Sequence, residues 1–164
     1  MSSIFFVGDL HFGHNNIHHF RKGLGLSSEE EHREFIIDRW NSVVNKRDVV
    51  WILGDAVFKQ EFIPELDRLR GQKFLVLGNH DLDGQHYRHH VNKVAGIIKY
   101  KGFWLSHAPI HPEELRGKPN IHGHVHANTL NDNRYFNASL ENIGYKPVSI
   151  EEVRRATVPD DISS

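Results

Sequence analysis

Five short stretches of the chain hold the side chains best suited to metal chemistry, and each lies at or just past the end of an apolar run. Their carboxylate, amide-oxygen and imidazole groups are ligands that hard and borderline divalent ions prefer. A spacing of two residues, as between His124 and His126, places both side chains on the same side of an extended backbone. Together the stretches predict one dinuclear metal site. They are Asp9-Leu-His11, Gly54-Asp55, Gly78-Asn79-His80-Asp81, Ser106-His107 and Gly123-His124-Val125-His126.

Length and composition favour a single globular domain over residues 1–164, with enough chain to bury a core. The formal net charge of -1 gives no basic field that would favour nucleic acid or a membrane surface. The absence of cysteine excludes disulfides, thiolate catalysis, zinc–cysteine sites and iron–sulfur clusters. The first apolar run, residues 4–7, is too short for a signal peptide or a membrane span, so we expect a cytoplasmic protein.

The first half of the chain alternates strand-like and helix-like segments. Continuous apolar runs predict buried strands, and the longer helix opens with a capping box formed by Ser28 and Glu31. This order predicts an α/β fold with a parallel sheet. The expected elements are strands at 4–7, 49–53 and 74–77, a helical turn at 17–20, and helices at 29–45 and 62–69.

The second half carries shorter strand candidates joined by short connections or loops, which predicts a second, more antiparallel sheet. Prolines mark residues 109–118 as a loop, and the His-rich segment 83–92 has room for one short helix. A capping box of Ser149 and Glu152 opens a final helix that ends near Ala156, and we expect residues 158–164 to fray. The strand candidates are 96–100, 102–106, 119–122 and 134–139.

Candidate ligands follow three of the predicted strands at their carboxyl ends. Such ends meet at one edge of a parallel sheet, where open α/β sheets bind ligands. Asp9, Asp55 and Asn79 each come directly after a glycine, whose missing side chain lets the backbone turn sharply. We therefore expect these residues, together with His11, to share one crevice.

The chain holds 14 histidines, and those in the glycine- and aspartate-containing corners are the candidate ligands. The remaining prominent histidines are interpreted as surface residues, and the three tryptophans as core residues. The histidines expected at the surface are His18, His19, His32, His86, His89 and His90, and the expected core tryptophans are Trp40, Trp51 and Trp104.

The order Asp-x-His, Gly-Asp, Gly-Asn-His-Asp, His and Gly-His-x-His resembles the calcineurin-like metallophosphoesterase superfamily over residues 9–126. The runs Asp-Leu-His-Phe-Gly-His near the start and Tyr-Lys-Pro-Val-Ser near the end resemble its small, single-domain bacterial and phage branch. The resemblance implies an α/β fold, a four-layer sandwich of two mixed β-sheets flanked by helices. It also implies a metal-dependent phosphoric ester hydrolase.

The resemblance further implies a role for each ligand. Two cations about 3.5–4 Å apart can jointly bind one hydroxide as the nucleophile. Mixed oxygen and nitrogen ligation without thiolate suits Mn²⁺, iron or Zn²⁺, and we expect Mn²⁺, with Ni²⁺ as a further alternative. The implied ligands are Asp9, His11 and His126 for the first ion, Asn79, His107 and His124 for the second, and Asp55 as the bridge.

By the same resemblance, His80 would steady the phosphoryl group and protonate the leaving oxygen, a duty that suits an imidazole near neutral pH. Asp81 is expected to shape the turn and not to act in chemistry. The candidate substrate contacts are His14, Asn15 and Arg116, with ordinary polar loop contacts as the alternative. Asn137 and Glu141 are interpreted as ordinary strand polarity in preference to support for the ligands.

The second motif narrows the substrate. Protein phosphatases of the superfamily carry Gly-Asp-x-Val-Asp-Arg-Gly, whereas this chain has Gly54-Asp-Ala-Val-Phe-Lys-Gln60. The missing second Asp and the missing Arg argue against a phosphoprotein phosphatase, and the length leaves no room for the capping domains of DNA-processing nucleases. We expect a phosphodiesterase for small nucleotide-type phosphodiesters. A phosphomonoesterase or protein phosphatase of the same fold is the alternative, and a non-catalytic protein-binding scaffold is disfavoured because His80 is retained.

Overall fold

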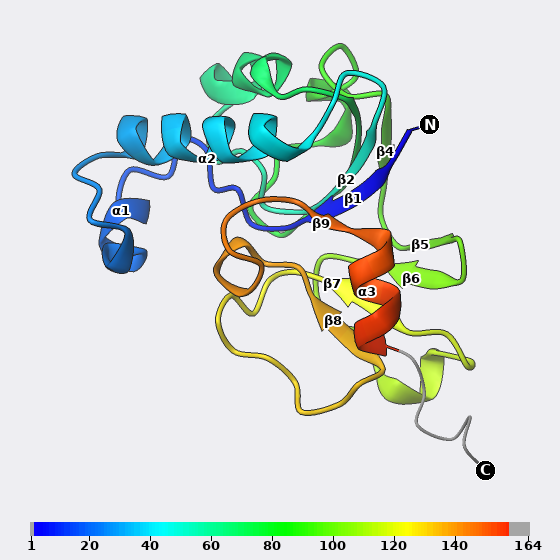
Figure 1. Cartoon of the computed structure of the whole chain (residues 1–164). Coiled ribbons are helices and arrows are strands. Elements are labelled where there is room, and N and C mark those ends of the chain that lie inside the picture. Colours follow the sequence, from blue (N-terminus) through cyan, green and yellow to red (C-terminus); the bar gives the residue numbers. More distant parts are fainter. Residues whose placement is uncertain (1, 158–164) are drawn as a thin grey trace.

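Two β-sheets pack against each other in the computed structural model, which describes residues 2–157 (Figure 1). The sheet orders are β4-β3-β2-β1-β9 and β5-β6-β7-β8. The strands are β1 (Ile4–Val7), β2 (Val49–Leu53), β3 (Gln72–Val76), β4 (Lys93–Ala95), β5 (Ile98–Tyr100), β6 (Phe103–Leu105), β7 (Asn120–His122), β8 (Tyr135–Asn137) and β9 (Val148–Ser149). The helices are α1 (Ile17–Phe20), α2 (Glu29–Val43) and α3 (Ile150–Thr157), with 3₁₀ segments η1 (Lys22–Leu24), η2 (Gln60–Arg68), η3 (Gly84–His86), η4 (Pro112–Glu114) and η5 (Leu140–Asn142).

The first sheet divides the interior into two cores. Its strands β1 to β4 are parallel, and β9 joins β1 antiparallel. Side chains alternate across a strand, so Val50 and Ile52 of β2 pack in the core that holds Trp40 of α2. Trp51 and Leu53 of the same strand pack in the core shared with the second sheet. The predicted arrangement of two mixed sheets flanked by helices is confirmed.

The second sheet differs from the expected antiparallel arrangement. Only β5 and β6 pair antiparallel, whereas β6, β7 and β8 run parallel to one another. The expectation was wrong because the segments 106–119 and 123–134 are long enough to carry the chain back to the start of the sheet. The candidate strand 96–100 corresponds to β5, which begins two residues later at Ile98, whereas β4 of the first sheet was not predicted.

The helices begin largely where their capping residues predict. Ser28 Oγ accepts from the Glu31 backbone N–H at 3.1 Å, although the Glu31 carboxylate bonds to the N–H of Ser27 and not of Ser28. Ser149 Oγ likewise accepts from the Glu152 N–H at 3.3 Å. The helix expected at 62–69 is instead the 3₁₀ segment η2, which contains Pro64, a residue without the N–H that an α-helix interior needs.

The tryptophans and the loops complete the comparison with the predicted elements. Trp40 and Trp51 are buried, as predicted. Trp104 is half-buried and donates its indole N–H to Leu115 O at 2.8 Å, so it lies at the edge of the core and not within it. The loop 109–118 contains the short segment η4, the segment 83–92 contains η3, and residues 158–164 lie outside the described part.

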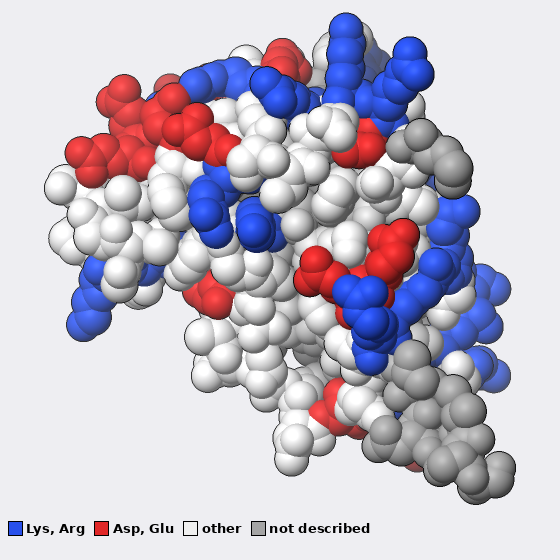
Figure 2. Space-filling model, viewed as in Figure 1, with Lys and Arg blue, Asp and Glu red and all other residues white. Residues whose placement is uncertain are grey.

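The surface shows charges of both signs on the face drawn in Figure 2, in keeping with the small net charge. Acidic side chains gather over the N-terminal end of α2, where Glu29, Glu30 and Glu31 form the first turn. Carboxylates at that end interact favourably with the helix dipole. Within residues 2–157, no helix is both long and apolar enough to cross a membrane.

Candidate metal centre

The predicted ligand-bearing stretches all follow strands of the two sheets. Asp9, Asp55 and Asn79 come after the carboxyl ends of β1, β2 and β3, as predicted. His107 and His124 come after β6 and β7 of the second sheet. Because parallel strands deliver their carboxyl ends to one edge, loops from both sheets converge on one crevice.

A first cluster consists of Asp9, His11 and His126, whose ligand atoms lie within 4.8 Å of one another. His11 Nε2 lies 3.7 Å from Asp9 Oδ1. Both of these atoms are buried without a hydrogen-bond partner among the described residues. Buried polar atoms are almost always satisfied, so the pair fits a bound cation that would ligate both.

A second cluster consists of Asp55, His107 and His124, again with ligand atoms within 4.8 Å of one another. His107 Nε2 lies 2.9 Å from Asn79 Oδ1 and 3.1 Å from His124 Nδ1. Four oxygen or nitrogen donors from separate loops therefore face a common point. Such a donor set without sulfur fits a divalent ion of the Mn²⁺, Fe²⁺ or Zn²⁺ type.

Asp55 belongs to the second cluster and also approaches the first. Its Oδ2 is 3.4 Å from His107 Nε2 and 3.9 Å from His11 Nε2, while its Oδ1 accepts from the His80 N–H at 2.9 Å. Burial acts to raise the pKa of Asp55, but hydrogen bonds with His107 and His80 outweigh it and hold that pKa below its usual range. The carboxylate is thus ionised, with one oxygen directed at both clusters.

Partners behind the histidines fix which ring nitrogen faces the crevice. His107 Nδ1 lies 2.8 Å from Leu53 O, and a carbonyl only accepts, so Nδ1 carries the proton and Nε2 is left for a ligand bond. His126 Nδ1 lies 2.8 Å from Glu141 Oε2 and is oriented in the same way. The interpretation of Glu141 as ordinary strand polarity was therefore wrong.

Glu141 belongs to a buried charge network that the sequence did not reveal. Its carboxylate accepts from Arg21 at 2.9 and 3.1 Å. Burial acts to raise the pKa of Glu141, but the hydrogen bonds from His126 and Arg21 bring that pKa down to about 2. Arg21 also donates to the backbone carbonyl of Asp9 at 2.7 Å, so the network connects both ends of the first cluster.

His32 corrects one of the surface assignments. It is fully buried, and its Nε2 lies 2.9 Å from Arg21 Nη1. Burial, and secondly the adjacent guanidinium, lower the pKa of His32 to about 3. His32 is therefore neutral and accepts from Arg21. Of the six histidines expected at the surface, it is the one that is buried.

Two further hydroxyl and amide groups support the first cluster. Ser139 Oγ donates to Asp9 Oδ2 at 2.6 Å, which leaves Oδ1 to face His11. Asn137 Nδ2 donates to the backbone carbonyl of His126 at 2.6 Å. Asn137 thus supports the loop that carries the candidate ligand His126, contrary to its interpretation as ordinary strand polarity.

Five of the candidate ligand residues have left-handed backbone conformations, which non-glycine residues rarely adopt and which cluster at functional sites. The backbone at His124 and His126 is consequently not extended, and the two side chains go to different clusters. The same-side expectation for this pair was wrong. The five φ angles are Asp9 62°, His11 58°, Asp55 51°, His124 73° and His126 51°.

Glycine is required where the ligand loops approach each other most closely. A Cβ atom at Gly78 would collide with the backbone nitrogen and Oδ1 of Asp55. One at Gly54, where φ is +89°, would collide with the ring of His107. These two glycines let the loops after β2 and β3 meet at van der Waals distance.

Asp81 ties the same two loops together through its carboxylate. It accepts from the backbone N–H groups of Asp55 at 2.8 Å, Ala56 at 2.8 Å and Gly78 at 2.7 Å. The expectation that Asp81 shapes the turn is confirmed by these bonds. Its side chain fixes the relative position of the residues on either side of the crevice.

His80 stands at the mouth of the crevice, with its side chain 51% exposed and its Nδ1 2.9 Å from Asp55 Oδ2. Its ring stacks on Phe58 at a centroid distance of 4.7 Å and an interplanar angle of 18°. Phe58 occupies the position at which the phosphatase motif has its second Asp. A stacked aromatic ring therefore adjoins the histidine where those phosphatases place a carboxylate.

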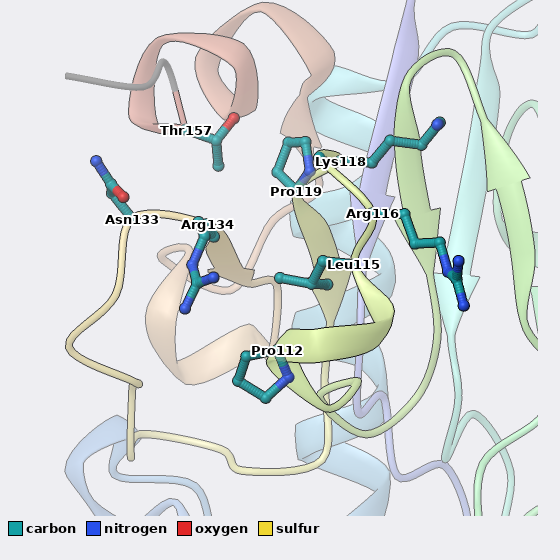
Figure 3. Close-up of a pocket in the computed structure, with 9 residues that line it drawn as sticks. Pro112, Leu115, Arg116, Lys118, Pro119, Asn133, Arg134 and Thr157 are labelled. Atoms are coloured by element: carbon teal, nitrogen blue, oxygen red, sulfur yellow. The ribbon is translucent and has the colours of Figure 1, made fainter. Parts of the chain in front are cut away.

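The three candidate substrate contacts differ in position. His14 lines a cavity of about 430 Å³ together with His11 and His126. Asn15 is exposed, bonds to Lys59 Nζ at 3.0 Å and is not among the residues that line this cavity. Arg116 lines a separate cavity of about 260 Å³, bordered by none of the candidate ligands (Figure 3). Its expected phosphate contact has no support in this arrangement.

Comparison with known sequences finds one family model and several relatives that match most of the chain. The family model described as calcineurin-like phosphoesterase matches residues 2–160. An uncharacterized protein of Methanocaldococcus jannaschii is 33% identical over 165 residues, which cover 92% of this chain and 89% of the relative. The Gene 66 protein of Mycobacterium phage L5 is 32% identical over 166 residues, covering 77% of this chain and 79% of the relative.

Solved structures with a similar fold agree. A crystal structure of a protein of unknown function from Aquifex aeolicus has a TM-score of 0.75 and 27% identity, covering 94% of this chain and 99% of the other. An archaeal phosphodiesterase has a TM-score of 0.50 and 17% identity, covering 84% of this chain and 82% of the other, which supports the fold alone. With its two mixed sheets and its paired clusters of aspartate and histidine, the chain belongs to the calcineurin-like phosphoesterase family.

Proposed function

We propose that the chain is a dinuclear-metal-dependent phosphodiesterase that acts on small phosphodiesters of the nucleotide type. The observation that carries the proposal is the position of Asp55 Oδ2 between two donor clusters, within 3.9 Å of His11 Nε2 and 3.4 Å of His107 Nε2. Family membership supports hydrolysis of phosphoesters. The accessible His80 beside the clusters supplies the group that such a reaction needs at its leaving oxygen.

In this proposal each cluster holds one divalent ion, with Mn²⁺ as the expected ion and iron, Zn²⁺ or Ni²⁺ as alternatives. Two ions bound there would supply the chemistry that activates water and offsets negative charge on the phosphoryl oxygens. The first ion would be held by Asp9, His11 and His126, the second by Asn79, His107 and His124, and Asp55 would contribute to both.

The protein residues divide the remaining work. Asp55 keeps its negative charge, and its Oδ2 accepts from His80 Nδ1. That bond orients the ring and leaves Nε2 available to the substrate. In the imidazolium form both ring nitrogens carry a proton, so Nε2–H can give its proton to the leaving oxygen while Nδ1–H stays on Asp55. Phe58 holds the plane of the same ring by stacking.

The lining of the cavity beside the first cluster favours a diester over a monoester. A phosphomonoester is a dianion, whereas a diester carries one negative charge. The residues that line the 430 Å³ cavity beside the first cluster include no Lys or Arg. The arginine of the phosphatase motif is replaced by Lys59, whose ammonium bonds to Asn15.

The proposal is tested by the substrate profile of the metal-reconstituted protein. We expect hydrolysis of bis(p-nitrophenyl) phosphate and of nucleotide diesters, and little or none of p-nitrophenyl phosphate. Chelation should remove the activity, and Mn²⁺ should restore it. Hydrolysis of monoesters alone would contradict the assignment and favour a phosphomonoesterase of the same fold.

Replacing Phe58 by alanine is expected to lower kcat by ~10- to 100-fold with little change in KM or metal content, because a displaced catalytic group loses rate without losing binding. Steady-state kinetics on a nucleotide diester, whose alkoxide leaving group needs a proton, provides the measurement. Phe58→Tyr keeps the stacked ring and should retain the rate. Equal losses in both variants, or loss of metal from the alanine variant, would show that Phe58 does not act through His80.

Replacing Glu141 by glutamine is expected to weaken metal binding by ~10- to 100-fold, because His126 loses the charged acceptor that strengthens it as a ligand. Competition with a chromophoric chelator measures the affinity. Glu114→Gln, which removes an exposed partner of Arg116, is the matched control. Arg21 is buried beside Glu141, so the substitution also removes the charged partner of a buried arginine and can destabilise the fold. Thermal unfolding of the metal-free variant, measured in chelator, shows whether the variant is folded. Unchanged affinity in a folded variant would contradict this role of Glu141.

A further inference from the structure

A stack of four aromatic rings extends from His80 to Phe20. His80 and Phe58 are 4.7 Å apart with an interplanar angle of 18°, and Phe58 and His14 are 4.7 Å apart at 17°. His14 and Phe20 continue the stack at 5.6 Å and 19°. The last ring, Phe20, is 74% exposed. The stack therefore begins at the proposed catalytic histidine and ends in an accessible aromatic face.

The local structure holds Phe20 in this exposed position. It ends the four-residue helix α1, whose Ile17 is buried and anchors the helix to the body of the protein. The Arg21 N–H bonds to Ile17 O at 2.9 Å, and the Arg21 side chain enters the buried network behind the first cluster. Phe20 is thus an exposed apolar ring on a segment fixed at both ends.

The cavity of about 430 Å³ lies between this ring and the first metal cluster. Its lining includes His11 and His126 on the cluster side and Ile17, Phe20 and Asn128 on the other. The volume falls within the range typical of small-molecule sites. A phosphodiester whose phosphorus lies at the clusters has room here for one of its two ester groups.

The lining chemistry identifies the kind of group that fits. On the side away from the cluster the cavity presents the ring of Phe20, the aliphatic Ile17 and the exposed amide of Asn128, which can both donate and accept. The rest of its lining is three imidazoles, Ala127 and the carboxylate of Glu141. Its lining includes no Lys or Arg, which disfavours a second phosphate. A nucleobase combines an apolar face for stacking with a polar edge for hydrogen bonds.

We propose that this cavity binds the nucleobase of the substrate, with the base stacked against Phe20 and its polar edge at Asn128. The inference rests on the proposed phosphodiesterase function and names the substrate class of that site. It makes α1 the specificity element of the enzyme, because α1 supplies the stacking ring while the metal ligands come from other loops.

The test compares two ligands that differ only in the base, AMP and ribose 5-phosphate. Isothermal titration of the Mn²⁺-loaded protein should show AMP binding ~10-fold tighter, in line with the contribution of one stacked base. Phe20→Ala should abolish this preference and leave the affinity for ribose 5-phosphate unchanged. Phe20→Trp, which keeps an aromatic ring, should retain it.

A matched control is Ile97→Ala, which removes another large exposed apolar side chain, 66% exposed, from the turn between β4 and β5. It should leave both affinities unchanged. Equal affinities for the two ligands in the unmodified protein, or a preference that survives in Phe20→Ala, would overturn the inference.

Hydrolysis of bis(p-nitrophenyl) phosphate by the same preparation separates the two proposals. Hydrolysis without a preference for AMP would overturn the nucleobase site and leave the phosphodiesterase standing. A preference for AMP that depends on Phe20, without hydrolysis of any diester, would overturn the phosphodiesterase and support a nucleotide-binding cavity.

Discussion

Substituting Asp55 by asparagine is expected to remove tight metal binding and, with it, hydrolysis. The carboxylate is buried and ionised between the two clusters, and it is the one candidate ligand directed at both. An amide has no charge to hold two cations together. Elemental analysis after gel filtration should find two ions per chain in the unmodified protein and none in the variant.

Asparagine is chosen because it can adopt the same backbone conformation as Asp55. Asp55 has φ 51°, a conformation that asparagine tolerates and alanine does not, so the variant tests the charge without added strain. Asp38→Asn, at an exposed position on α2, is the matched control and should retain both ions. Two tightly held ions in Asp55→Asn would show that Asp55 does not bridge them.

Replacing His80 by alanine is expected to lower turnover by ~10²- to 10⁴-fold, the range for loss of a general acid, while both ions remain bound. The loss should depend on the leaving group. A p-nitrophenolate leaves readily without a proton, whereas the alkoxide of a nucleoside does not. Rates for both kinds of diester, measured with the metal content, check the prediction.

His89→Ala provides the control for His80, since His89 is exposed and lies nearby in the chain, in the histidine-rich segment 83–92. It should leave turnover unchanged. An equal loss in His80→Ala for activated and unactivated leaving groups would contradict proton donation and point to a role in positioning the phosphoryl group. Loss of either ion from His80→Ala would contradict the prediction that His80 is not a metal ligand.

Much of the fold follows from local sequence. The run Val49–Leu53 is apolar throughout, and such a run finds partners on both faces only inside a layered sheet. Strand β9 has only two residues, too few for an apolar pattern. Its antiparallel pairing with β1 therefore could not be predicted from its own sequence. The parallel course of β6 to β8 depends on where long loops return, which residue spacing does not encode.

The convergence of the candidate ligands could be predicted because each follows a strand end, but their supports could not. Arg21 and Glu141 are 120 positions apart, so no spacing rule connects them. Their pairing behind His126 exists only after both sheets have formed. Phe58 was visible as a departure from the phosphatase motif, yet its stacking on His80 depends on the three-dimensional approach of two loops.

Five candidate ligand residues lower the stability of the fold through their left-handed backbone conformations. They are Asp9, His11, Asp55, His124 and His126. Each costs on the order of 1–2 kcal/mol relative to a relaxed conformation, and glycine would remove most of that cost. A chain selected for folding alone would therefore place glycine at these positions. Ions that bind only the folded chain would offset this strain, and metal loading would then raise the thermal stability of the protein.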